Sequence, residues 1–133
     1  MSRRNIGSHN PFEDGYGYSR AVRVGDHVFV SGTTARPDDL GADAYVQAKS
    51  ALAIIATAMA GLGAGFADVV RTSVFIVDMA DIDLVTRAHA EAFGTIRPTS
   101  TLLQVAALTP AQARVEIEIT AIVADAAKPG AAT

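Results

Sequence analysis

The chain has 133 residues, enough for one domain with a single sizeable hydrophobic core. Half of the residues are hydrophobic but only 6% are aromatic, so Val, Ile, Leu and Ala must build that core. A net charge of −3 argues against a broad surface for nucleic acid or anionic membranes, and the lack of cysteine excludes disulfides, thiolate nucleophiles and Cys-ligated metals.

The N-terminal segment, residues 1–17, is rich in Gly, Ser, Asn, Asp and Pro, which predicts an irregular segment. Its basic residues are not followed by an apolar stretch, so it lacks the pattern of a signal peptide. Residues 50–67 carry no charge, but glycines interrupt them and Ala and Thr lower their hydropathy, so we expect no membrane span. We therefore expect a cytoplasmic protein.

Residues 18–124 are predicted to form the domain, with elements in the order β-β-α-β-α-β-β, and residues 125–133 a flexible tail. Strands are expected at residues 18–24, 27–31, 68–78, 101–107 and 115–123, the first two joined by a Gly25-Asp26 turn. Helices are expected at residues 43–61, with Asp43 as the N-cap, and at residues 81–94.

This order predicts an α+β domain with one mixed sheet and two helices on one face. Val74 to Val77 are apolar on both faces of their strand, which predicts that the second face is buried as well. A chain this short has nothing left to cover that face, so we expect another copy of the chain to do so.

The last predicted strand carries two carboxylates. Glu116 and Glu118 alternate with apolar residues, so both project from the same face of the strand. A carboxylate in this pattern is either a solvated charge or a placed functional group, and the pattern alone favours the solvated charge.

Other polar residues have simple structural interpretations. His9, His27 and His89 show no metal-ligand spacing, so we expect no metal site. Ser31 lacks the pattern of a nucleophile elbow, although the backbone at Ser31-Gly32 could approach a ligand closely. By composition, Tyr18 is typical of a packing residue.

Three stretches resemble the RidA/YjgF family: residues 18–32, residues 74–79, and Arg97-Pro98 followed by Val115–Ile119. The resemblance spans residues 18–123. It implies a chorismate-mutase-like fold assembled as a homotrimer, with sites in the clefts between subunits. The strands at residues 74–77 and 115–123 would then contribute to a shared central barrel.

The resemblance also implies an activity, because the best-known members hydrolyse reactive enamines and imines to a 2-keto acid and ammonia without a cofactor. Their site pattern falls here on Tyr18, on the Ser31-Gly32 backbone and on Glu118, which would act as a general base through a water molecule. Between subunits Glu118 should be partly desolvated and its pKa raised, with Glu116 as the internal control.

The chain departs from that pattern where the deaminases bind the substrate carboxylate. Ser100 stands in place of the family's arginine, which argues against small 2-imino acids as substrates and places the chain in a branch lacking this arginine. Arg20 is the first candidate to replace it. Arg87 is another, although Asp83 and Glu91 one turn away favour a surface ion pair for it. The alternative is a neutral or larger ligand.

Three functions remain open. The first is cofactor-independent deamination of a reactive enamine, imine or related small metabolite. The second is a trimeric small-ligand-binding or chaperone-like protein that has lost the chemistry. An endoribonuclease or translation inhibitor comes third, because no basic groove or aromatic stacking platform is evident in the sequence.

Overall fold

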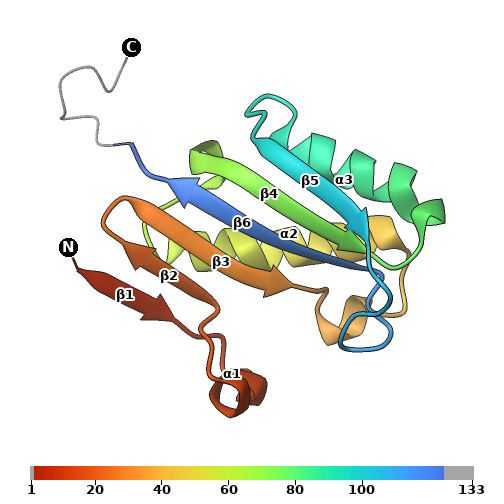
Figure 1. The fold of residues 1–133 in the computed structure, drawn as a ribbon, viewed down its shortest axis with the longest axis horizontal. Coiled ribbons are helices and arrows are strands. Elements are labelled where there is room, and N and C mark those ends of the chain that lie inside the picture. The colour runs from red at the N-terminus through yellow and green to blue at the C-terminus, as the bar shows by residue number, and fades with distance from the viewer. Residues whose placement is uncertain (1, 125–133) are drawn as a thin grey trace.

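The computed structural model describes residues 2–124, which form a six-stranded sheet with two long helices on one of its faces (Figure 1). The strands are β1 (Arg3–Ile6), β2 (Ala21–Val24), β3 (His27–Thr33), β4 (Val69–Ile76), β5 (Thr99–Gln104) and β6 (Val115–Ile122). The helices are α1 (Pro11–Tyr16), α2 (Ala44–Ala60) and α3 (Ile82–Phe93). The sheet order is β1-β2-β3-β6-β4-β5, in which only β4 and β5 are parallel.

The α+β class and the mixed sheet with two helices on one face are confirmed. α2 begins where expected, because the Asp43 carboxylate accepts a hydrogen bond of 2.9 Å from the Val46 N–H. The Gly25-Asp26 turn also joins β2 to β3, and Gly25 has the positive φ of 58° that such a turn requires.

The expectation of an irregular N-terminal segment is wrong for residues 3–6 and 11–16. β1 pairs antiparallel with β2, and α1 is capped by the Asn10 side chain, which accepts from the Phe12 N–H. The strand has no apolar alternation, since its first three side chains are exposed and only Ile6 packs against the core. Tyr18 precedes β2 and does not lie on a strand. The predicted tail, residues 125–133, lies outside the described residues.

The core lies between the sheet and the two long helices. One face of α2 is buried there, with Ile55 and Met59 fully enclosed where the helix packs against β3 and β6. The opposite face is open in the single chain: Phe29, Leu103 and Ile122 are 46%, 41% and 41% exposed. We call this surface the open face of the sheet.

Buried Gln47 connects α2 to the loops at one end of the sheet. Its amide donates to the carbonyls of Leu40, Ala42 and Gln112, and its oxygen accepts from the Arg114 N–H at 2.8 Å. This satisfied polar group therefore fixes the loop that leads into β6. Among residues 2–124, none of the helices combines the length and the hydropathy needed to cross a bilayer.

Candidate functional site

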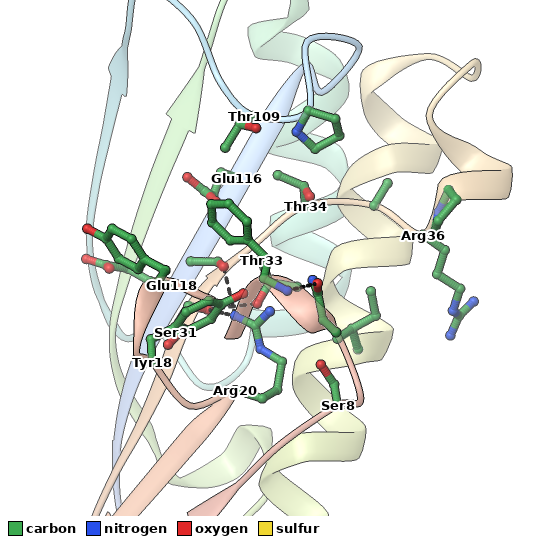
Figure 2. Close-up of a pocket in the computed structure, with 18 of the residues that line it drawn as sticks. Ser8, Tyr18, Arg20, Ser31, Thr33, Thr34, Arg36, Thr109, Glu116 and Glu118 are labelled. Atoms are coloured by element: carbon green, nitrogen blue, oxygen red, sulfur yellow. Dashed lines mark hydrogen bonds between the residues drawn. The ribbon is translucent and has the colours of Figure 1, made fainter. Parts of the chain in front are cut away.

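A pocket of about 1010 Å³ lies on the open face, where β3 and β6 run side by side (Figure 2). Its walls come from the N-terminal segment around α1, from the chain that follows β3, and from the loop at Thr109-Pro110. This volume is at the upper end of the range typical of small-molecule sites.

A β-bulge forms one wall of the pocket. Val30 pairs with Ile119 and Thr33 with Ile117, so the two residues Ser31 and Gly32 lie opposite the single residue Glu118. Bulges break the regular pairing and redirect backbone groups, and they are common beside active sites. The backbone at Ser31-Gly32 therefore lines the pocket, as the sequence suggested.

Arg20 holds this bulge in place. Its Nη2 donates to the carbonyl oxygens of Ser31 and Gly32, at 2.7 and 2.8 Å. The side chain is only 8% exposed, and its Nε is buried without a partner. Burial lowers the pKa of Arg20, against the opposing effect of Tyr18, Glu13 and Glu116. Most of the guanidinium is thus committed to the protein rather than presented to a ligand.

The two carboxylates of β6 have different surroundings. Glu116 is half-buried, and its carboxyl group lies so close to Gly32 that a Cβ there would be 3.0 Å from its Cδ. Burial raises the pKa of Glu116, and neighbouring Glu118 adds to this, whereas Arg20 opposes it. Glu118 is exposed and pairs across the sheet with Ser73. Burial therefore perturbs the acidity of Glu116, which the sequence analysis treated only as a control.

The structure brings most of the predicted site residues together and leaves two apart. The pocket is lined by Tyr18, Arg20, Ser31, Gly32 and Glu118. Ser100 and Arg87 do not line it. The sequence could have indicated Glu116, since it shares a strand face with Glu118, but the contact with Gly32 depends on the register of β3 against β6.

Ser100 lies on the helix-covered face of the edge strand β5, in register with Thr72 of β4. Its Oγ accepts a hydrogen bond of 2.7 Å from the Thr72 hydroxyl, which also lies 2.9 Å from Nε2 of His89. Burial lowers the pKa of His89. In one chain Ser100 is thus separated from the pocket by the sheet, and only a neighbouring copy could bring the two together.

Arg87 is engaged on the helical side of the molecule. Its guanidinium carbon lies 3.9 Å from the ring centre of Tyr45, a cation–π contact between α3 and α2. Glu91, one turn further along α3, accepts a hydrogen bond from the Tyr45 hydroxyl and pairs with Lys49 at 3.6 Å. Arg87 therefore has a structural contact in the single chain, but with the Tyr45 ring rather than through the surface ion pair that the sequence favoured.

Three aromatic rings line the pocket on the side of the N-terminal segment: Phe12, Tyr16 and Tyr18. Their ring centres lie 5.9 to 6.4 Å from one another. The sequence analysis did not anticipate this group, because it took residues 1–17 as irregular. Within residues 2–124, no group of three His, Asp or Glu side chains could hold a metal ion.

Comparison with known proteins identifies the family. The family model described as Endoribonuclease L-PSP matches residues 10–123. An uncharacterized protein of Streptomyces coelicolor is 39% identical over 121 residues, which cover 89% of this chain and 90% of that protein. The human 2-iminobutanoate/2-iminopropanoate deaminase is 32% identical over 109 residues, or 79% of each chain.

Among solved structures, a Mycobacterium tuberculosis member of the YjgF/YER057c/UK114 family superposes with a TM-score of 0.85 and 43% identity, covering 92% of this chain and all of that one. The match to the family model covers β2 to β6, both long helices and the pocket-forming N-terminal segment from residue 10, whereas β1 precedes it. The chain therefore belongs to the RidA/YjgF family.

Proposed function

We propose that this protein hydrolyses the C=N bond of a reactive imine or enamine in the pocket on the open face, without a cofactor. The observation that carries the proposal is the half-buried Glu116 carboxyl, with its raised pKa, beside the backbone bulge held by Arg20. A carboxyl group whose pKa is raised above its ordinary value is a better proton acceptor when ionised, and the same group can return the proton.

The steps follow from these positions. The Glu116 carboxylate accepts a proton from water as the water oxygen bonds to the imine carbon and the C=N π electrons move to nitrogen. The same carboxyl then protonates that nitrogen, which gives a carbinolamine. The regenerated carboxylate next takes the proton of the carbinolamine hydroxyl and delivers it to nitrogen, so that the C–N bond breaks, the carbonyl forms and ammonia or an amine leaves. Tyr18 and Glu118 line the same pocket and would orient the water and the ligand. We thus assign the proton transfer to Glu116, whereas the sequence analysis chose Glu118.

Relatives support imine chemistry but do not select one substrate, since some are named imine deaminases and the family model is described as an endoribonuclease. Two carboxylates in one pocket would repel the phosphates of RNA, which favours the imine over the nucleic acid. A ligand-binding protein that has lost the chemistry would keep the pocket but would not depend on the acidity of Glu116.

We also propose that the functional unit is a homotrimer. Exposed apolar side chains on the open face, among them Phe29, Leu103 and Ile122, support a second copy packing there. In such an assembly the neighbour would partly desolvate Glu118 and could bring its Ser100 or Arg87 toward the pocket. Light scattering at micromolar concentration tests this, and a monomer or a stable dimer would contradict it.

The activity is tested with a panel of imines generated in situ from different amines and amino acids, with detection of the carbonyl product. Glu116→Gln should lower turnover by at least about 100-fold, because general acid–base catalysis typically contributes 100- to 10,000-fold. Glu118→Gln is the matched control on the same strand and should lower turnover by a smaller factor. Equal losses in both variants would refute the assignment to Glu116, and no turnover above the spontaneous rate for any imine would refute the activity.

A further inference from the structure

An aromatic wall forms the outer side of the pocket. Phe12 and Tyr16 lie on α1 and Tyr18 just beyond it, with Phe12 and Tyr16 stacked at 5.9 Å and an interplanar angle of 8°. Phe12 is 57% exposed and Tyr16 is 77% exposed, so neither ring is needed to fill the core. Two large exposed rings held against a third at the mouth of a pocket offer a stacking surface for a planar ligand.

The charges in the pocket do not suit a ligand carboxylate. Glu116 and Glu118 both line the pocket. The Nη2 of Arg20 donates hydrogen bonds to two backbone carbonyls, and its Nε is buried. The other cation in the lining is Arg36, which Figure 2 places across the pocket from Tyr18 and Glu118 with its guanidinium directed away from them. In the single chain, a ligand carboxylate beside the two glutamates would meet two like charges, against the one buried cation of Arg20, which already attracts Glu116.

We propose that the substrate is an imine that carries an aromatic ring and no carboxylate, with its ring against Phe12, Tyr16 and Tyr18 and its nitrogen toward Glu116 and Glu118. This rests on the proposed function, and it names the substrate class of that same site. The protonated form of an imine fits both features, because a cation is attracted to aromatic faces and to carboxylates. Protonation also makes the imine carbon more electrophilic, so the group that binds is the group that reacts.

Binding is tested first, on the assembled full-length protein, by NMR titration with three stable probes: benzylamine, phenylacetate and butylamine. Benzylamine has the ring and the cation, phenylacetate has the ring with the opposite charge, and butylamine has the cation without the ring. We expect benzylamine to bind about 2- to 30-fold more tightly than either of the others, since a cation–π or stacking contact contributes about 0.5–2 kcal/mol. Phenylacetate binding as tightly as benzylamine would overturn the proposal.

The aromatic wall is tested with the double variant Phe12→Ala/Tyr16→Ala. Both side chains are exposed, so the fold should persist, as checked by circular dichroism. Benzylamine affinity should fall by about 2- to 30-fold while butylamine affinity stays unchanged. The control is Ile82→Ala, which removes a side chain that is 40% exposed on α3, outside the pocket, and should change neither. Unchanged benzylamine affinity in the double variant would overturn the proposal.

Turnover separates this proposal from the general activity. The imine formed from 2-phenylethylamine by an amine oxidase, which gives phenylacetaldehyde and ammonia on hydrolysis, should be processed with at least 10-fold higher kcat/KM than 2-iminobutanoate. If 2-iminobutanoate is the better substrate, the proposed hydrolysis stands and the substrate class is wrong. If benzylamine binds through the aromatic wall but no imine is hydrolysed, the ligand class is supported and the hydrolysis is refuted.

Discussion

Replacing Arg20 with methionine distinguishes a structural cation from a ligand-binding one. The sequence suggested that Arg20 binds the carboxylate of a ligand, whereas the structure shows its guanidinium donating to the carbonyls of Ser31 and Gly32. Methionine keeps much of the apolar stem and removes the charge and the donors. The Arg20→Met variant should therefore lose stability even without a ligand.

The expected loss follows from the contacts. Two hydrogen bonds from a charged donor contribute roughly 3–6 kcal/mol together, at about 1.5–3 kcal/mol each. The substitution also removes the buried, unpartnered Nε. The desolvation penalty of that group, about 1–3 kcal/mol, then no longer destabilises the fold. At the middle of these ranges, about 4.5 kcal/mol is lost and about 2 kcal/mol regained, so the net destabilisation should be about 2–3 kcal/mol, a large fraction of the stability of a small domain.

Urea unfolding at fixed protein concentration measures this, since oligomerisation makes stability depend on concentration. With a slope of about 1.5 kcal/mol per molar urea, the midpoint should fall by roughly 1–2 M. Arg36→Met is the matched control, because Arg36 is an exposed arginine of the same pocket, and it should stay within about 0.5 kcal/mol of the wild type. Equal stability of the two variants, with loss of carboxylate binding only in Arg20→Met, would refute the structural role.

Three further predictions address the pocket and the open face. Gly32→Ala places a Cβ 3.0 Å from the Glu116 Cδ and should lower imine turnover at least about 10-fold. Gly41→Ala is the control, because its Cβ would have nothing within 4 Å, and it should not change turnover. Comparable steady-state kinetics for the two variants would show that the contact between Gly32 and Glu116 does not matter for turnover. Because burial raises the pKa of Glu116, its charge opposes folding above the ordinary value of 4.5, so Glu116→Gln should gain stability relative to the wild type as the pH rises from below 4.5 to 7. Urea midpoints measured across that range test the sign, and a relative loss on raising the pH would mean that attraction to Arg20 dominates. Phe29→Glu places a charge on the open face and should dissociate the proposed trimer in light scattering; an unchanged assembly would exclude this part of the face as an interface.

Local sequence features predicted the main helices and strands of the fold. Asp43 predicted the start of α2 because a capping carboxylate acts on the N–H three residues on, and the alternation of residues 115–123 predicted β6 because side chains of a strand alternate between faces. The same alternation placed Glu116 and Glu118 on one face. The apolar Val74–Val77 run predicted that the second face of the sheet is buried as well, but that face is open in the single chain, so its burial by another copy stays a prediction.

The roles of individual site residues depended on contacts between distant parts of the chain. The bulge at Ser31-Gly32 arises from the register of β3 against β6, and only that register brings the Glu116 carboxyl over Gly32 and makes it the half-buried acid. The bulge also places the carbonyls of Ser31 and Gly32 within hydrogen-bonding distance of Arg20, so this side chain stabilises the backbone there. The sequence did not predict β1, because a strand that pairs with the edge of a sheet needs no apolar pattern of its own. Periodicity is a property of neighbouring residues, whereas desolvation and hydrogen-bond partners are set by whatever the fold places opposite them.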